Sequence, residues 1–222
     1  QAGFSVVSYT GNQTNNATVG HGLSETPECI ILKDRDTAVN WIVYHKGVDS
    51  TNPEQFFLHL NSTDTRQDLG DVFNDVAPGS SVFTLGNSTQ SNGNTKKYIA
   101  YCWHSVEGYS KFGSYTGNGS ADGSFVYLGF KPAFILLKSP TGAFDWQLYD
   151  STRSPNNPAT LSLRPNLGNA EVTSGNDLDI LANGFKCRDN GSPNNNSGST
   201  YIYMAFAENP FGGENVPPAT AR

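Results

Sequence analysis

PECIILKDRDTAVNWIVY, from Pro27 to Tyr44, is a sequence that this chain contains almost twice. It returns from Pro132 to Tyr149 as PAFILLKSPTGAFDWQLY, at a constant offset of 105 residues. In both copies a proline precedes an apolar run, a lysine and a polar loop follow, and a Trp-x-x-Tyr segment ends the stretch. Two short apolar runs joined by a polar loop predict a β-hairpin, so each copy predicts the same hairpin.

The repetition extends beyond this hairpin. Tyr9-Thr10-Gly11-Asn12 returns as Tyr115-Thr116-Gly117-Asn118, and Tyr98-Ile99 returns as Tyr201-Ile202. A period near 105 exceeds the roughly 20–50 residues of solenoid repeats and suits complete small domains. We therefore predict two homologous domains, residues 1–108 and 109–211, followed by an extended Pro/Gly-rich C-terminal arm, residues 212–222.

Nearly all of the ordered-looking segments have strand character. They are short runs rich in β-branched and aromatic residues, bounded by Gly, Pro, Asn and Asp, and no convincing amphipathic helix is present. The clearest are residues 4–9, 29–33, 41–45, 56–60, 82–85 and 98–103 in the first copy, and 125–128, 134–138, 146–149, 161–163, 184–187 and 201–207 in the second. This density of strands predicts an all-β fold, with each domain a β-sandwich.

Composition excludes several classes of protein. Charged residues make up only 15% of the chain and the formal net charge is −6, which argues against a nucleic-acid partner. No stretch approaches the roughly 18 consecutive apolar residues of a membrane span, so no membrane insertion is predicted. The richness in Gly, Asn, Ser and Thr is typical of extracellular or virion-surface β proteins. Because the chain starts at Gln1 without a methionine, we expect a processed product or a fragment.

The cysteines predict free thiols. Their number, three, excludes a fully paired intramolecular disulfide set, and they occupy non-equivalent places in the two copies. Cys29 aligns with Phe134, and Cys102 aligns with Ala205. We expect buried thiols that act as small apolar groups.

The tryptophans predict core positions. Trp41 and Trp146 occupy equivalent places inside apolar strands, and Trp103 aligns with Phe206. Aromatic side chains retained at equivalent strand positions after a duplication are typically core residues. Each one removes roughly 150–250 Å² of its surface from water when it is buried. The alternative is an exposed platform on which a sugar ring stacks.

Two equivalent polar loops, residues 87–94 and 189–198, and tyrosines beside turns supply the candidate ligand-binding residues. Tyr combined with Asn, Ser and Gly is the composition of adaptable recognition loops, although it is also common in β proteins in general. The candidates are Asn92, Asn94, Asn194, Asn196, Tyr109 and Tyr127.

Neither metal chemistry nor catalysis has a specific signal. The four histidines (His21, His45, His59 and His104) lack zinc-site spacing, so no metal site and no cofactor is predicted. Ca²⁺ is the alternative, in the oxygen-rich loops that hold Asp34, Asp36 and Asp122. No Gly-x-Ser-x-Gly elbow is present, and the carboxylates that a glycosidase needs are placed by the fold rather than by the sequence. The candidate acids are Asp75, Asp145, Asp150 and Glu208, and we predict a non-enzymatic protein with no catalytic residues.

Several motifs together resemble a known domain family. They are Gly3–Ser5, Tyr9–Asn12, Gly20–Leu23, Asn40-Trp41 with Tyr44-His45, Val106–Gly119 and Tyr201–Phe211. They are similar to an uncharacterised β-rich family found in tail-fibre-like and other virion structural proteins of marine bacteriophages, including cyanophages. The resemblance spans essentially the whole chain. It implies a virion surface location and a role in attachment or assembly, and it brings no functional residues to transfer.

The resemblance favours one function and leaves two alternatives. The favoured function is a tail-fibre or receptor-binding module that recognises host cell-surface glycan. The alternatives are a structural capsid-decoration or tail-assembly protein and, third, a polysaccharide-cleaving enzyme. The expected partners are the host glycan and other virion proteins. A homo-oligomer is expected, with a trimer implied by the resemblance to tail fibres.

Overall fold

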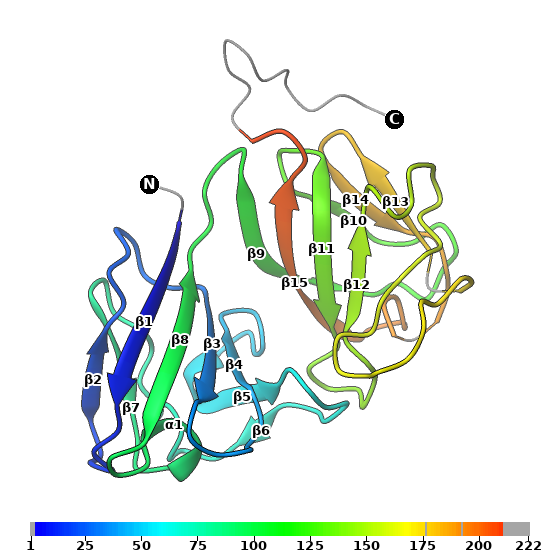
Figure 1. Ribbon diagram of the computed structural model, residues 1–222. Helices are drawn as coiled ribbons and strands as arrows, with labels where there is room; N and C mark the ends of the chain where they lie inside the picture. The colour runs from blue at the N-terminus through cyan, green and yellow to red at the C-terminus, as the bar shows by residue number, and fades with distance from the viewer. Residues whose placement is uncertain (1–2, 176, 192, 211–222) are drawn as a thin grey trace. The chain divides into compact units, whose positions relative to one another are not determined.

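The computed structural model describes residues 3–175, 177–191 and 193–210 (Figure 1). The chain divides into two compact units, Gln1–His104 (unit 1) and Ser105–Arg222 (unit 2). This division and the boundary predicted after residue 108 both lie between strand β8 (Lys97–Trp103) and strand β9 (Ser110–Thr116). The predicted arm, residues 212–222, lies outside the described residues.

Unit 1 is built from two antiparallel sheets. The larger has the order β1-β8-β3-β4-β5-β6 and the smaller pairs β2 with β7. The bounds are β1 Phe4–Thr10, β2 Ala17–Gly20, β3 Cys29–Asp34, β4 Ile42–His45, β5 Phe56–His59, β6 Gln67–Asp68 and β7 Val82–Leu85, with a 3-10 turn η1 at Pro53–Gln55 and one helical turn α1 at Thr89–Asn92. Residues of β3, β4 and β8 form a buried core with Phe83 and Leu85 of β7, so the two sheets make a sandwich.

Unit 2 repeats this arrangement. A four-stranded sheet has the order β12-β11-β15-β9, and a three-stranded sheet has the order β10-β14-β13. The remaining bounds are β10 Phe125–Tyr127, β11 Pro132–Lys138, β12 Gln147–Asp150, β13 Leu178–Leu181, β14 Gly184–Cys187 and β15 Thr200–Ala207. The core joins Ile135, Leu137 and Tyr203 of the larger sheet to Ile180 and Phe185 of the smaller one.

The strand order shows the duplication directly. The series β1-β8-β3-β4 of unit 1 corresponds to β9-β15-β11-β12 of unit 2, and β2-β7 corresponds to β10-β14. The predicted hairpins are confirmed, since β3 pairs with β4 and β11 pairs with β12 in antiparallel register. The all-β prediction and the sandwich architecture are therefore confirmed.

Some details differ from the sequence prediction. Residues 161–163, predicted as a strand, form only isolated bridges, from Leu163 to Leu148 and from Ser162 to Val172. Strand β13 was not predicted, because its four residues follow a polar segment and include Asp179. The three cysteines are free and buried, as predicted.

Candidate functional site

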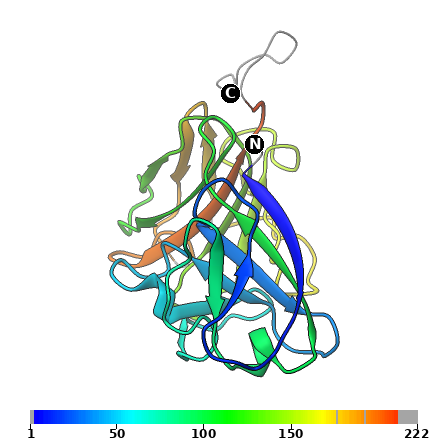
Figure 2. The same ribbon diagram turned by 90° about the vertical axis from the view of Figure 1, so that its left-hand side faces the viewer.

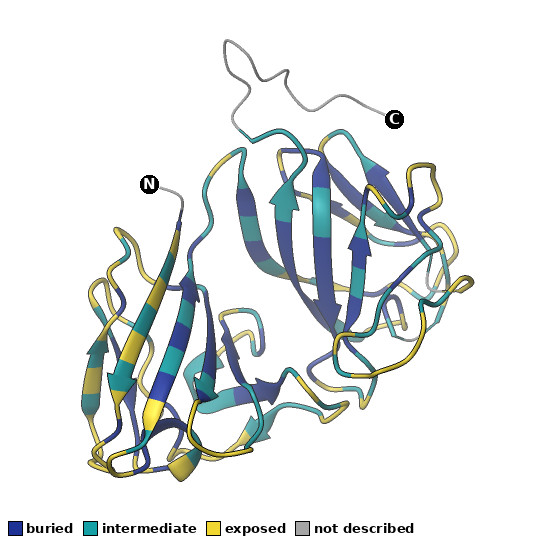
Figure 3. Ribbon diagram, viewed as in Figure 1, coloured by how far each residue is buried: buried dark blue, intermediate teal, exposed yellow. Residues whose placement is uncertain are grey.

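Four aromatic side chains line up on the outer face of the larger sheet of unit 1. Along β8, Tyr98, Ala100 and Cys102 are buried, so the alternating residues Tyr101 and Trp103 point to the opposite face. Phe4 of β1 lies opposite Trp103 in the strand register, and its side chain is 44% exposed. Figure 3 shows the alternating burial along these two strands. We call Phe4, Trp103, Tyr101 and Trp41 the aromatic row.

The rings of the aromatic row are nearly parallel. Phe4 and Trp103 have ring centroids 5.0 Å apart and an interplanar angle of 24°. Trp103 and Tyr101 lie 6.2 Å apart at 20°, and Tyr101 and Trp41 lie 6.5 Å apart at 22°. Phe4 is exposed and the other three rings are partly exposed, so the row presents a ridge of aromatic surface to solvent. Contiguous exposed apolar patches on a protein surface often mark a binding site.

The prediction that Trp41 and Trp103 are core residues is wrong. Trp146 is buried, with 3% exposure, as predicted, but neither Trp41 nor Trp103 belongs to the buried core of unit 1. The reason is that Trp41 immediately precedes β4, where Ile42 takes the core-facing position. A one-residue step along an extended chain reverses the face, so Trp41 lies on the outer face of the sheet. Trp146 precedes β12 in the same way, so its burial comes from the residues that cover it and not from its place along the strand.

Polar groups stand at both ends of the aromatic row. At the Trp103 end, the backbone nitrogen of Glu28 donates to the carbonyl of Trp103 at 2.7 Å, and the Glu28 carboxylate pairs with Lys46. At the Trp41 end, the Asn61 amide accepts from the backbone nitrogen of Trp41 at 2.9 Å and donates to Asn40. Aromatic side chains with polar groups beside them match a ligand that has both apolar surface and hydroxyl groups.

Unit 2 packs its corresponding aromatic residues differently. Phe206, the counterpart of Trp103, contacts Tyr109, Phe112 and Phe134 edge-to-face, at interplanar angles of 74°, 88° and 60°. Phe112 is 1% exposed. The parallel row is thus a feature of unit 1 and not of the duplicated fold.

A second exposed aromatic pair lies on β10 of unit 2. Phe125 is 46% exposed and Tyr127 is 60% exposed, while Val126 between them faces the core. The ammonium group of Lys111 lies 5.3 Å from the Tyr127 ring centroid and donates to the Tyr127 carbonyl at 2.8 Å. Of the predicted ligand-binding residues, Tyr127 is therefore the one with the largest aromatic surface available to a partner.

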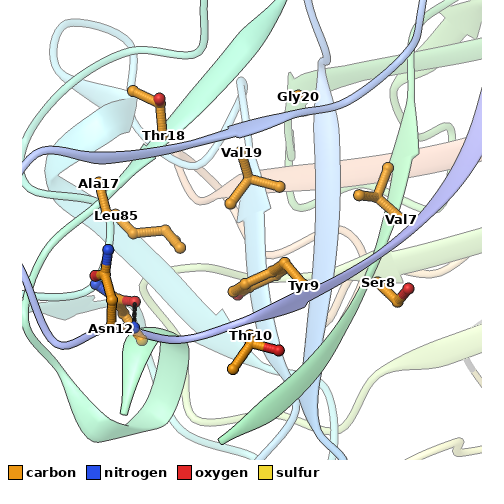
Figure 4. Close-up of a pocket in the computed structure, with 11 residues that line it drawn as sticks. Val7, Ser8, Tyr9, Thr10, Asn12, Ala17, Thr18, Val19, Gly20 and Leu85 are labelled. Atoms are coloured by element: carbon orange, nitrogen blue, oxygen red, sulfur yellow. Dashed lines mark hydrogen bonds between the residues drawn. The ribbon is translucent and has the colours of Figure 1, made fainter. Parts of the chain in front are cut away.

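A cleft opens between β1 and β2 of unit 1 (Figure 4). It has a volume of about 320 Å³, at the small end of ligand pockets. Tyr9, Val19 and Leu85 extend into the space between the strands, and Ser8, Thr10 and Thr18 stand at its rim. The Tyr9 hydroxyl already donates to the Ser91 carbonyl at 2.7 Å, so its proton is engaged within the fold.

The two predicted recognition loops contain a duplicated internal anchor. In unit 1 the amide of Asn92 accepts from the Asn12 backbone nitrogen at 2.9 Å and donates to the carbonyls of Thr14 and Gly86 at 3.1 and 2.7 Å. In unit 2 the amide of Asn195 accepts from the Asn118 backbone nitrogen at 3.0 Å and donates to the carbonyls of Ser120 and Asp189 at 2.8 and 2.7 Å.

The repeated Tyr-Thr-Gly-Asn motif belongs to the same anchor. Tyr9 stacks on Tyr98 at 5.1 Å, and Tyr115 stacks on Tyr201 at 5.2 Å. A Cβ atom on Gly11 would overlap the Gly93 carbonyl, which explains why a glycine is needed there. The motif therefore holds a loop against the end of β1 or β9, and its repetition serves the fold.

The structure places the predicted loop residues in different environments. Asn92 and Asn194 are buried, at 1% and 0% exposure, so neither side chain lies at the loop surface. Asn94 and Asn196 are exposed at the loop surface. Tyr109 is partly exposed against Phe206. Asn195, the true counterpart of Asn92, was missed by the sequence analysis, although the offset of 103 residues that relates Tyr98 to Tyr201 also relates these two asparagines.

The aspartates considered for Ca²⁺ are used within the chain. The carboxylate of Asp34 accepts from the backbone nitrogens of Asp36 and Thr37 at 2.7 and 3.1 Å, and Asp36 accepts from the Lys97 nitrogen. Asp122 pairs with Lys186 at 2.6 Å. In residues 3–175, 177–191 and 193–210, no group of three or more His, Cys, Asp and Glu side chains is placed to hold a metal ion.

Three of the four candidate acids are held by cations. Asp145 pairs with Arg164, Asp150 with Arg153, and Glu208 with Lys131. Asp75 is exposed, at a residue with φ of 52°. Each of these three carboxylates is therefore already engaged within the fold.

The chain is thus a tandem pair of β-sandwich units that share a strand order and an asparagine anchor in the same loop. The family model described as "Domain of unknown function (DUF7483)" matches residues 1–210, and the chain belongs to this family. No curated protein and no solved structure matches the chain. Among the helices within the described ranges, none is long and apolar enough to cross a membrane.

Proposed function

We propose that this protein is a non-enzymatic virion surface module that binds host cell-surface carbohydrate through the aromatic row of unit 1. The observation that carries the proposal is the near-parallel, solvent-facing arrangement of Phe4, Trp103, Tyr101 and Trp41. The virion context rests on the motif resemblance to marine phage proteins.

Carbohydrate fits this surface because of its chemistry. A pyranose ring has an apolar C–H face that packs on an aromatic ring, and its hydroxyls hydrogen-bond to polar groups beside that ring. The row supplies the rings. The Glu28–Lys46 pair supplies polar groups beside Trp103.

Binding to glycan gives a direct test. Fluorescently labelled chain is added to marine cyanobacterial cells, with and without periodate oxidation of their surface sugars, and to polysaccharide extracted from the same cells. We expect saturable binding that periodate abolishes. We also expect extracted polysaccharide to protect tryptophan fluorescence from acrylamide, because Trp41 and Trp103 lie in the row while Trp146 is buried.

Matched variants locate the site. Phe4→Ala and Trp41→Ala together should lower the affinity at least tenfold, which corresponds to about 1.4 kcal/mol. Leu69→Ala, a change at a side chain of unit 1 that is 50% exposed and lies outside the row, should leave the affinity unchanged. Tyr127→Ala tests the exposed pair of unit 2 separately. Loss of binding in Tyr127→Ala with full binding in the double variant would move the site to unit 2.

A second candidate function is assembly through β1. This strand lies at the edge of its sheet, and its seven residues, FSVVSYT, contain no charge and no proline. Edge strands usually carry a charge or a proline that prevents pairing with other chains, and β1 has neither. Both Phe4 and Val6 are exposed on it. We propose a second copy of this chain as the partner, added strand to strand.

The oligomeric state in solution tests this candidate. Light scattering coupled to size exclusion should show a concentration-dependent oligomer that Val6→Lys converts to a monomer, because a charge blocks pairing at an edge. Leu69→Lys is the control for added charge. A chain that is monomeric at every concentration contradicts assembly through β1 and leaves the carbohydrate proposal untouched.

A further inference from the structure

Two aromatic side chains lie next to each other on the outer face of the smaller sheet of unit 2. Phe125 and Tyr127 alternate along β10 with Val126, which faces the core, so both rings point away from the core on the same face. Both side chains are exposed. Two residues along a strand span roughly 7 Å, so the two rings are neighbours. The sheet order β10-β14-β13 places this pair on an edge strand (Figure 1).

Ammonium groups flank the pair on both sides. Lys111 of β9 reaches the Tyr127 ring and donates to the Tyr127 carbonyl, and among the described residues it forms no ion pair. Lys186 of β14 lies opposite Phe125 in the strand register and pairs with Asp122 at 2.6 Å. The side chain of Asp122 is 81% exposed, so water and salt screen this ion pair and it holds Lys186 only weakly. Both ammonium groups can therefore accept an anionic partner.

Unit 1 folds without these groups. Strands β2 and β7 correspond to β10 and β14, and the core-facing pairs set the correspondence, since Val19 lies opposite Phe83 and Val126 lies opposite Phe185. Small, neutral residues occupy the equivalent places in unit 1. The counterparts of Phe125, Tyr127, Lys186 and Lys111 are Thr18, Gly20, Thr84 and Ser5. The exposed rings and the flanking charges are thus not required by the fold.

The size of the patch indicates the kind of ligand. A whole aromatic side chain buries roughly 150–250 Å², so two of them supply at most about 500 Å². A stable protein–protein interface needs roughly 800 Å² from each partner. The patch is therefore small for a folded protein partner, whereas a single extended chain of sugars needs only a few rings and charges. The positive flanks favour a ligand that carries negative charge.

We propose that the outer face of β10 is a second site, which binds the acidic sugars of a polysaccharide. Sugar rings pack their C–H faces on Phe125 and Tyr127, and the carboxylate or sulfate groups that they carry pair with Lys111 and Lys186. The site uses no residue of the aromatic row, and its ligand is defined by charge. Its test is therefore independent of the carbohydrate proposal for unit 1.

Binding of defined oligosaccharides to the whole chain tests the proposal. Calorimetry compares three probes, namely short oligosaccharides of alginate, which carry carboxylates, of carrageenan, which carry sulfates, and of dextran, which is neutral. We expect one of the two acidic probes to bind, with an affinity that falls as the salt concentration is raised. The comparison of the two tells carboxylate from sulfate. No binding of either acidic probe at millimolar concentration, or equal binding of dextran, overturns the proposal.

Variants that install the residues of unit 1 locate the site. Phe125→Thr and Lys111→Ser should each lower the affinity for the acidic probe about tenfold, the first without any change of charge. Asp122→Asn should raise the affinity about threefold, because it removes the carboxylate that competes for Lys186. Circular dichroism checks the fold of each variant, although unit 1 already folds with Thr and Ser at these places.

Two controls separate this site from other modes of binding. Lys97→Ser removes an exposed ammonium group of unit 1 and should leave the affinity unchanged. A loss as large as that of Lys111→Ser would reduce the binding to general charge attraction and refute the site. The Phe4→Ala, Trp41→Ala double variant should bind the acidic probe normally. Loss of binding in this double variant, with full binding in Phe125→Thr, would assign the acidic ligand to the aromatic row and refute the proposal.

Discussion

Replacing Asn92 with alanine removes the amide that ties three backbone segments of unit 1 together. The side chain makes three hydrogen bonds, to Asn12, Thr14 and Gly86, and is 1% exposed. Each such bond contributes about 1 kcal/mol net, and a buried group left without a partner costs about 1–3 kcal/mol. We therefore expect Asn92→Ala to lower the free energy of unfolding by about 3–5 kcal/mol, a large share of the roughly 5–15 kcal/mol of a typical domain.

Urea denaturation measures this loss. Far-UV circular dichroism follows both units, and the fluorescence of Trp41 and Trp103 weights the signal toward unit 1. Asn195→Ala should destabilise unit 2 to a similar extent, because its amide makes the equivalent bonds. Asn94→Ala, two residues along the same loop and exposed, should change stability by less than about 0.5 kcal/mol. A loss below about 1 kcal/mol for Asn92→Ala would refute the reasoning that this amide holds the loop.

Three other predictions concern single groups. Gly11→Ala should destabilise unit 1 in thermal unfolding, because the added Cβ overlaps the Gly93 carbonyl. Gly20→Ala, whose Cβ meets only an atom 3.9 Å away, should be nearly neutral, and equal effects of the two changes would contradict the steric argument. The three buried thiols should resist a disulfide reagent at pH 8 and react only in denaturant. The reason is that burial raises the pKa of Cys102 and Cys187 to about 12 and that of Cys29 further. Rapid labelling of the folded chain would contradict this prediction. Burial opposes ionisation of Asp34, but hydrogen bonds from Thr37 and Asp36 lower the pKa of its carboxyl. The Asp34 carboxylate should therefore stabilise the fold above its unfolded pKa of about 3.9, and this stabilisation should be lost as the pH falls through the folded pKa. A difference in stability between wild type and Asp34→Asn that stays constant from pH 7 to pH 2 would contradict this prediction.

The β-fold could be predicted from the sequence because its signals are local. The apolar runs around Ile31 and Leu136 are each followed by a polar loop and a second run, and both became antiparallel hairpins. Strand β13 could not be predicted in this way, because Leu178–Leu181 has no clear strand pattern of its own and becomes a strand by pairing with β14. The duplication was also visible, because two copies of a whole domain leave long matching segments.

The candidate site could not be predicted, because it depends on which face of a strand is covered. Trp41 and Trp146 are equivalent in sequence, yet Trp146 is buried and Trp41 stacks on Tyr101 at the outer face. Likewise Asn92 and Asn94 lie in the same polar loop, but only the first turns inward. Loop composition does not distinguish an asparagine that holds the loop from one that contacts a partner.

The comparison between the two units separates what the fold requires from what it leaves open. Features present in both, namely the strand order, the stacked tyrosines and the Asn92 or Asn195 anchor, are sufficiently explained by stability. Features present in one unit only need a different explanation, since the other copy folds without them. The parallel aromatic row of unit 1 is of this kind. Binding is therefore to be sought in the places where the copies differ, and the duplicated motifs, although they are the clearest signal in the sequence, report on the scaffold.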